Sequence, residues 1–367
     1  MMHFTLTEDD QLIVASVTEL CAKSMGQAAD WDDAGQLPGS ILTEVADLGL
    51  LGMSTPQALG GVELSGIVRA AVPEALGGGD AALALVVAGH DGLAAAHVAR
   101  AATPAQRAAW LGAWAAGEPL VAWCEPGTEL SGQMCGEGLR VSGQTPVTAG
   151  VGLAGRFVVN VPLDRGIASA LVLGEQAGVS RTKVDRLGMR AAAAGRVVFD
   201  DVLIPLEALI GAPGDGVVAS LMAEFQIALG AIACGVGRAA LAAASVYSMQ
   251  REQFGQPISN FQAIQWKLAN AATELDAAAL LVGRAAWMLE QRQPFEAAAA
   301  QAKVAASEAA ERACSEALQI HGGYGYTREF PVERHLRAAK TLSMAAGSNR
   351  ASRKTAAAAI ARRFGGS

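Results

Sequence analysis

Residues 251–262 read Arg-Glu-Gln-Phe-Gly-Gln-Pro-Ile-Ser-Asn-Phe-Gln and follow a long apolar stretch, 217–250, with helical character. The Phe-Gly-Gln-Pro segment predicts a turn, because glycine adopts positive φ freely and proline cannot continue a helix. Arg251 places a permanently charged fork of donors at this turn, which suits a phosphate group. Gln262 begins the next helix and offers an amide. Taken alone, the segment is also explained by a plain helix connection with a surface arginine.

A second glycine-rich segment ends a later helix. Residues 319–326 read Gln-Ile-His-Gly-Gly-Tyr-Gly-Tyr, and residues 329–334 read Glu-Phe-Pro-Val-Glu-Arg. Three glycines in four positions allow a close backbone approach and positive φ. As a lone cluster they are typical of a helix C-cap. His321 taken alone is more simply a packed or capping histidine than a catalyst.

Together the two segments resemble the acyl-CoA dehydrogenase family. The shared pattern is Arg-x-x-Phe-Gly-x-Pro-Ile-x-x-Phe-Gln, then Gln-x-x-Gly-Gly-x-Gly-Tyr, then Pro-Val-Glu-Arg. Further matches spread the resemblance over most of the chain: Leu-Gly-Leu-Leu-Gly at 48–52 with Gly-Gly at 60–61, Leu-Gly-Met-Arg at 187–190, and Val-Phe-Asp-Asp-Val-Leu-Ile-Pro at 198–205.

The composition agrees with a large folded protein of this kind. The chain has 367 residues, of which 51% are hydrophobic and 17% charged, and this balance excludes a disordered chain. A net charge of −7 and the lack of a basic tail argue against nucleic-acid binding. The uncharged stretch between Glu224 and Arg238 holds 13 residues, fewer than the roughly 20 of a membrane span, and so predicts a buried helix.

Targeting and metal signals are lacking. Residues 1–5 have no basic or apolar run of a signal peptide. The five cysteines are far apart and form no Cys-x-x-Cys pair, so neither disulfides nor zinc are expected. His90 and His97 lie seven residues apart with no third ligand nearby, and no metal is expected. We therefore expect a cytoplasmic protein without a membrane span.

The chain changes character twice. Residues 1–119 read as an N-terminal helical domain, residues 120–212 as a small antiparallel β domain, and residues 213–367 as a helical bundle of four. The clearest strands are short, β-branched and bounded by turn residues, at 139–141, 156–161, 169–173 and 196–199. The fold class predicted is α+β, mostly α, in the order of the acyl-CoA dehydrogenases.

The resemblance implies FAD, bound between the β domain of one subunit and the C-terminal helices of another. By motif position, the neighbouring subunit's contacts would be Arg251, Gln253, Phe254, Ile258, Gln262, Gln319, Ile320 and Gly323. The contacts on the β-domain side would be Trp123, Cys124 and Thr148. The partners implied are an acyl-CoA substrate, an electron-transfer flavoprotein, and further subunits in a homo-oligomer or a heteromer.

The β domain departs from the family pattern in two places. The usual Thr-Glu-Pro is Cys-Glu-Pro at 124–126, and the Gly-Ser-Asp that follows it is missing. Cysteine is a poor hydrogen-bond donor for a flavin ring. The usual Trp-Ile-Thr is Pro-Val-Thr at 146–148, which keeps Thr148 but loses the aromatic ring. The flavin end of the site is therefore expected to be either more open or collapsed.

The catalytic base is missing from its usual position. The reaction needs a carboxylate to remove the substrate α-proton, and alanine occupies that position, at Ala346. A second location used in the family, 26 residues before Arg251, holds Phe225. Glu224 is one residue away, which turns its side chain by about 100° on a helix. Glu224 is thus a weak candidate for the base.

Three functions remain open from the sequence. The chain is an active acyl-CoA dehydrogenase with an unusual base, or a non-catalytic subunit that contributes half of an FAD site to a partner chain. The third reading is a different flavin enzyme, an oxidase or monooxygenase, on the same fold.

Overall fold

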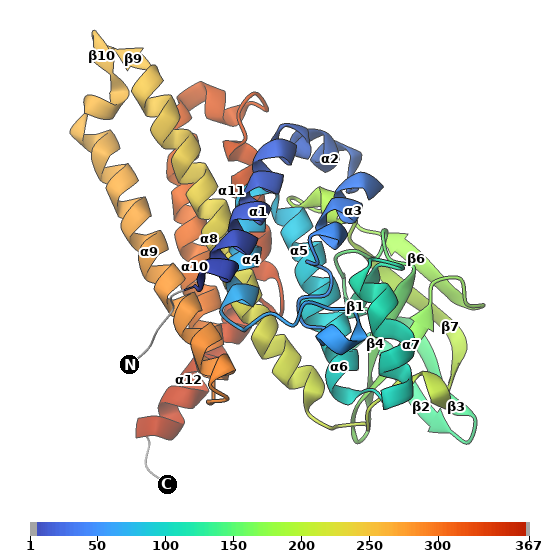
Figure 1. Cartoon of the computed structure of the whole chain (residues 1–367). Coiled ribbons are helices and arrows are strands. Elements are labelled where there is room, and N and C mark those ends of the chain that lie inside the picture. Colours follow the sequence, from blue (N-terminus) through green and yellow to red (C-terminus); the bar gives the residue numbers. More distant parts are fainter. Residues whose placement is uncertain (1–5, 365–367) are drawn as a thin grey trace.

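The structure is a computed structural model that describes residues 6–364, and it confirms the expected order of helices, strands and helices (Figure 1). Residues 1–5, which carried the signal-peptide interpretation, lie outside the described part. Helices make up both ends of the described chain, and two small sheets lie between them.

The N-terminal helices pack around an apolar core. The first begins after a reciprocal cap in which the Thr7 hydroxyl accepts from the amide of Asp10 at 3.2 Å. A π-helical turn, η3, joins α5 and α6 into one bent rod. The helices are α1 (Glu8–Ser24), α2 (Ala28–Ala34), α3 (Gly39–Asp47), α4 (Val68–Gly79), α5 (Ala81–Gly89), η3 (His90–Ala95), α6 (Ala96–Ala101) and α7 (Pro104–Ala115).

The middle part holds two four-stranded sheets, in the orders β1-β4-β5-β8 and β2-β3-β7-β6. Most neighbours are antiparallel as expected, but β1 and β4 run parallel. The strands are β1 (Val121–Cys124), β2 (Leu130–Cys135), β3 (Gly138–Gln144), β4 (Arg156–Leu163), β5 (Gly166–Leu173), β6 (Val179–Lys183), β7 (Gly195–Pro205) and β8 (Leu209–Ile210). The expected boundaries at 119–120 and 212–213 fall in the loops before β1 and after β8.

The C-terminal helices number five among residues 217–364, one more than expected. They are α8 (Val217–Gln250), α9 (Gln262–Glu290), α10 (Glu296–His321), α11 (Val332–Met344) and α12 (Ser348–Phe364), with the short hairpin β9 (Glu252–Gln253) and β10 (Gln256–Pro257). Residues 332–364 do not form one continuous helix, because the chain breaks after Met344. Ala346 and Gly347 adopt positive φ there, which an α-helix excludes.

The N- and C-terminal helices share one hydrophobic core, and the two sheets enclose a second. Helices α4 and α8 approach so closely that a Cβ on Gly235 would lie 2.0 Å from the backbone oxygen of Glu74. The rod 81–101 and helix α8 are long and apolar enough to cross a membrane. However, 89% and 67% of their most apolar windows are buried inside the molecule, as core helices are.

One buried carboxylate joins the three parts. Asp32 of α2 accepts hydrogen bonds from the backbone and guanidinium of Arg190, and it pairs with Arg337 of α11 at 2.9 Å. Burial raises the pKa of Asp32, but the two guanidinium groups outweigh it and hold that pKa below its usual value. This cluster fixes the β domain against both sets of helices.

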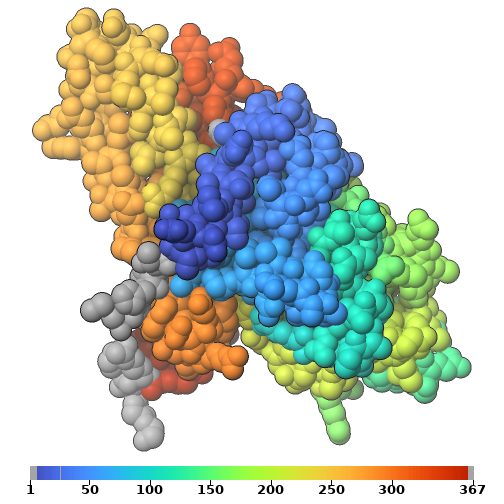
Figure 2. Space-filling model, viewed as in Figure 1, coloured from blue at the N-terminus to red at the C-terminus, as the bar shows by residue number. Residues whose placement is uncertain are grey.

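The ends of α8 and α9 extend past the N-terminal helices. Figure 2 shows this projecting arm in yellow and orange, with the β9–β10 hairpin at its tip. The two ends of the molecule are therefore very different in exposure, and the expected site residues are divided between them.

Candidate active site

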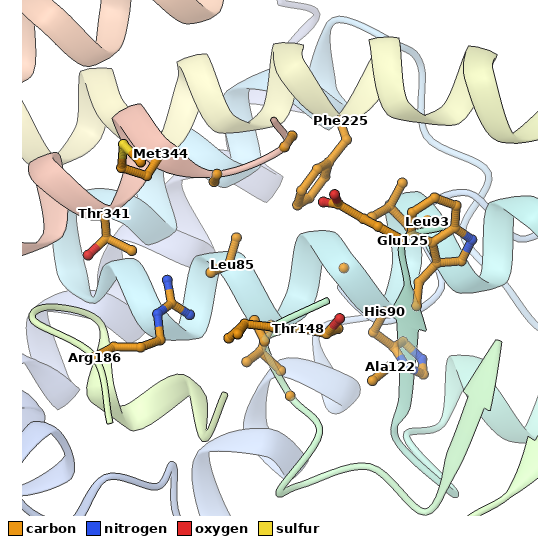
Figure 3. A pocket seen from close by; sticks show the side chains of 18 of the residues that line it. Leu85, His90, Leu93, Ala122, Glu125, Thr148, Arg186, Phe225, Thr341 and Met344 are labelled. Carbon is orange, nitrogen blue, oxygen red and sulfur yellow. The ribbon is translucent and has the colours of Figure 1, made fainter. Parts of the chain in front are cut away.

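A cavity of about 610 Å³ lies where the three parts meet (Figure 3). Helix α5 and the π-turn η3 form its floor, β1 and the loop at 147–150 form one wall, and α8 and the end of α11 form another. Most of its lining is apolar, with a few polar side chains, which is the usual make-up of a small-molecule site. The polar and charged side chains in the lining are His90, Glu125, Thr148, Arg186, Lys340, Thr341 and Ser343.

Two buried histidines hold strand β1 in place. The His90 ring bridges the backbone oxygen of Trp114 and the backbone amide of Val121, each at 2.9 Å. His97 accepts from the indole nitrogen of Trp123 at 3.0 Å. Burial lowers the pKa of both rings, that of His97 to about 4, so both are neutral near pH 7. These histidines position β1, and among residues 6–364 no group of three or more candidate ligands could hold a metal ion.

Glu125 follows β1 and extends into the cavity, where its carboxylate lies beside the ring of Phe225 (Figure 3). It makes no hydrogen bond or ion pair within the described part of the chain. Burial raises the pKa of Glu125, and the positive charge of Lys303 partly offsets that rise. The cavity therefore contains an unpaired carboxylate of increased basicity.

Lys303 lies on α10, behind the part of the cavity lining that contains Ala345. Its side chain is 1% exposed, and its ammonium group donates to the backbone oxygen of Ala345 at 2.5 Å. Burial lowers the pKa of Lys303 to about 8, while the charge of Glu125 acts in the opposite direction. A buried cation is thus tied to the residue next to the expected base position.

Arg186 lies at the opposite end of the cavity, near Thr341 and Met344 (Figure 3). Burial lowers its pKa below the usual value, and no carboxylate of residues 6–364 pairs with it. An unpaired, half-buried guanidinium is suited to an anionic ligand. Thr148 lies between the two ends, with its backbone held by Gly195 at 2.8 and 3.0 Å.

Both expected locations of the base line this one cavity, and both are apolar. Phe225 projects from α8, and Ala346 lies in the break between α11 and α12 with φ of 48°. A non-glycine residue in this left-handed region is strained, and such strain is common in active sites. The cavity is open, so the loss of the aromatic at Pro146 has not collapsed it.

Glu224 does not face the cavity, and this corrects its candidacy as the base. Its carboxylate accepts from both terminal nitrogens of Arg100, one of them at 2.6 Å, and from the Ser220 hydroxyl at 3.2 Å. Successive side chains of an α-helix are rotated by about 100°, so Glu224 points away from the cavity that Phe225 lines. The pairing with Arg100 makes Glu224 a structural residue.

The three expected contacts on the β-domain side differ in outcome. Trp123 and Thr148 line the cavity, but the Cys124 side chain does not. Cys124 is fully buried in the core of the sheets, where burial raises its pKa to about 12. The alternation of a strand explains this, since neighbouring side chains point to opposite faces. The cysteine is therefore wrong as a side-chain contact.

The expected C-terminal contacts lie away from this cavity. None of the eight lines it, and all but Ile258 and Ile320 are exposed; Phe254 is 93% exposed at the tip of the projecting arm. This set is Arg251, Gln253, Phe254, Ile258, Gln262, Gln319, Ile320 and Gly323. One chain alone does not bring the two sets of expected contacts together. This separation agrees with the implied division of the FAD site between two subunits.

Family models match both helical parts. Residues 7–118 match the N-terminal domain of acyl-CoA dehydrogenases, and residues 214–361 match the C-terminal domain. A probable acyl-CoA dehydrogenase of Bacillus subtilis is 32% identical over 95% of this chain and 97% of that protein. The chain belongs to the acyl-CoA dehydrogenase family.

Other relatives of this acyl-CoA dehydrogenase-like chain share its whole length. Benzylmalonyl-CoA dehydrogenase of Aromatoleum aromaticum is 32% identical over 92% of this chain and 93% of its own. Butyryl-CoA dehydrogenase of Megasphaera elsdenii has a TM-score of 0.93 at 29% identity, over 98% of this chain and 100% of that one. A chain from a structural study of the electron transferring flavoprotein of Acidaminococcus fermentans has a TM-score of 0.94 at 28% identity, with the same coverage.

Sequence reasoning missed three charged side chains in or behind the cavity of this family member. Glu125 was quoted only as part of a motif, and Lys303 and Arg186 were not considered. The alternation of side chains along β1 was the available signal for Glu125. Residues 123 and 125 point to the same face of the strand, and residue 124 points to the other. Nothing in the sequence marked Lys303, whose role depends on a contact with a residue 42 positions away.

Proposed function

We propose that this chain dehydrogenates an acyl-CoA thioester between Cα and Cβ, with FAD as the acceptor. The observation that carries the proposal is the single cavity that collects Trp123 and Thr148 of the β domain with both family base positions, Phe225 and Ala346. Family membership and the dehydrogenase relatives support the same reaction class.

The residues present fit FAD. When bound, FAD supplies the acceptor for the hydride that leaves Cβ. The cavity offers an apolar volume of about 610 Å³ with a threonine hydroxyl in its wall and an unpaired arginine at one end. Thr148 would donate to the ring system, Trp123 would pack beside it, and Arg186 would offset negative charge. The exposed Arg251 of a second copy would hold the pyrophosphate.

The chain's own residues prepare the site for this chemistry. The apolar side chains exclude water, which strengthens every electrostatic interaction inside the cavity. The histidine pair fixes β1, so that Trp123 and Glu125 keep their orientation. Lys303 holds the backbone at Ala345 and places a positive charge behind the wall. A thioester bound here would lie between these fixed groups.

The proposed setting follows from the split site. We propose an oligomer in the cytoplasm, in which the projecting arm of one copy completes the cavity of another. Either a second copy of this chain or a related acyl-CoA dehydrogenase-like chain could supply the arm. An electron-transfer flavoprotein would then reoxidise the bound flavin.

A second candidate function is a non-catalytic subunit. The observation that favours it is the pair of apolar residues, Phe225 and Ala346, at both family base positions. Such a chain would supply its exposed arm to the cavity of a partner chain and perform no proton transfer itself. A different flavin reaction on the same fold is the third possibility, since it needs no carboxylate at those positions.

The visible spectrum of the chain purified alone tests the proposal. We expect a stoichiometric flavin spectrum that bleaches anaerobically when an acyl-CoA is added. A flavin that no acyl-CoA bleaches would favour a different flavin reaction. A colourless protein that added FAD does not reconstitute would favour the non-catalytic subunit.

A further inference from the structure

We infer that Glu125 is the base that removes the substrate α-proton in this chain, in place of the carboxylate that Phe225 and Ala346 cannot provide. This inference rests on the proposed function. It assigns the chemistry to a side chain that follows β1 and enters the cavity beside Phe225.

The position of Glu125 supports the assignment. It is the only carboxylate among the residues that line the cavity in the described chain. Its carboxylate lies beside the Phe225 ring, at the wall where one family base would project (Figure 3). Ala346, the other base position, lines the same cavity. Glu125 therefore shares one cavity with both family base positions.

The partners of Glu125 support it as well. Glu224, the neighbouring buried carboxylate on α8, is already paired with Arg100. Glu125 has no hydrogen bond or ion pair among residues 6–364, so its lone pairs remain free to accept a proton. A base also needs a pKa near working pH, and burial moves that of Glu125 in this direction.

Lys303 acts as a positioning residue for this base. Its ammonium group bonds the backbone of Ala345, and its charge reaches Glu125. A cation at this place favours the carboxylate form and limits the rise that burial causes. The other titratable side chains in the lining are His90, Arg186 and Lys340. His90 has both nitrogens in hydrogen bonds, and Lys340 pairs with Glu311.

Dehydrogenation breaks one C–H bond at Cα and one at Cβ. An oxygen of Glu125 takes the proton from Cα and becomes a carboxylic acid. The electron pair of the broken Cα–H bond becomes the second bond between Cα and Cβ. The hydride from Cβ passes to FAD, which is thereby reduced by two electrons. The products are the enoyl-CoA, reduced flavin and protonated Glu125.

Proton removal can be measured apart from hydride transfer. In a 3-thia-acyl-CoA, sulfur replaces Cβ, so the α-proton can exchange with D2O while no hydride leaves. We expect Glu125→Gln to keep its FAD spectrum, and to slow both α-proton exchange and flavin bleaching by about 10³-fold. Glu224→Gln is the matched control, because it makes the same change one residue from the cavity, and it should exchange at the wild-type rate.

A rescue variant separates catalysis from structure. Ala346→Glu restores a carboxylate to the family position, and in the Glu125→Gln background it should recover exchange at least tenfold. If Glu125 had only a structural role, a new carboxylate at position 346 would not restore exchange. Loss of FAD by Glu125→Gln, or exchange within threefold of wild type, would overturn the assignment.

The pKa of Glu125 gives a readout that needs no turnover. The carboxyl band that disappears in Glu125→Gln should titrate above the usual glutamate range in the infrared spectrum, and Lys303→Met should move it to higher pH. The exchange rate should rise over the same pH range. Wild-type bleaching together with an unshifted band would refute Glu125 while leaving the proposed function intact. A wild type that no acyl-CoA bleaches would refute both.

Discussion

The cavity at the end of β1 and the projecting arm at the tip of α8 and α9 differ in almost every physical respect. The cavity is enclosed, largely apolar and built from all three parts of the chain. The arm is exposed, with Phe254 93% and Trp266 61% accessible. The arm keeps its family motif, whereas the cavity has lost both base positions. The proposed contact of this motif with another subunit would explain why the arm carries the motif while the cavity of the same chain lacks both bases.

Complementation between two defective variants gives the largest expected effect. If each site combines the cavity of one copy with the arm of another, Glu125→Gln chains should be slow, and Arg251→Ala chains should lack flavin at an FAD concentration that just saturates the wild type. A co-refolded equal mixture should regain about a quarter of wild-type activity, because each mixed dimer contains one intact site of two. The bleaching rate of the mixture measures this. No recovery would mean that the cavity and the arm of the same chain, or of a different partner, work together.

Loss of the buried carboxylate of Asp32 should lower the stability of the folded chain. Asp32→Asn leaves Arg190 and Arg337 without their shared partner, and we expect a loss of about 3 kcal/mol in the free energy of unfolding. The pKa of Asp32 is lowered in the folded state, so its contribution is present above the unfolded pKa and disappears as the pH falls through the folded pKa. Urea unfolding of both chains at pH 7 and in acid measures the loss of unfolding free energy and its dependence on pH. An equal loss at both pH values would contradict the role of the carboxylate.

Weakened cofactor binding is the next effect in size. Arg251→Ala removes an exposed guanidinium from the arm without disturbing the cavity. We expect an FAD affinity that is 10- to 100-fold lower, because a charge-assisted bond to phosphate is lost. Equilibrium dialysis measures it, and Arg328→Ala, an exposed arginine outside the FAD set, is the control. An unchanged FAD affinity of Arg251→Ala would mean that the arm does not contact FAD through this residue.

The smallest expected effect concerns the acyl chain. Phe225 lines the main cavity and also a second one of about 40 Å³, whose walls include Arg69 and Asp91. Phe225→Ala should join the two and improve kcat/KM for longer relative to shorter acyl-CoAs by about tenfold, since one methylene is worth 1–3 kcal/mol. Steady-state kinetics over a chain-length series measures this. A preference that stays unchanged would mean that Phe225 does not limit the pocket.

The sequence supported the fold better than the site. Periodicity and the two glycine-rich motifs predicted the helix–strand–helix order, and short β-branched runs located β3, β4, β5 and β7. The fifth C-terminal helix was not predicted, because the local pattern does not reveal the break at Ala346. Spacing from Arg251 correctly separated Phe225 from Glu224. The contact of Lys303 with Ala345 depends on tertiary packing, which no local pattern contains.

The apolar character of α8 has a consequence for synthesis. This helix of 34 residues meets the composition test for a membrane span, and two thirds of its most apolar window is buried. Helix α4 is available to cover it as soon as it is made, but α10, which also packs on it, follows about 50 residues later. During that interval a growing chain exposes an apolar surface that favours aggregation. Chains that stop before Glu296 should therefore need a chaperone to stay in solution, whereas a chain that includes α10 covers this apolar surface of α8.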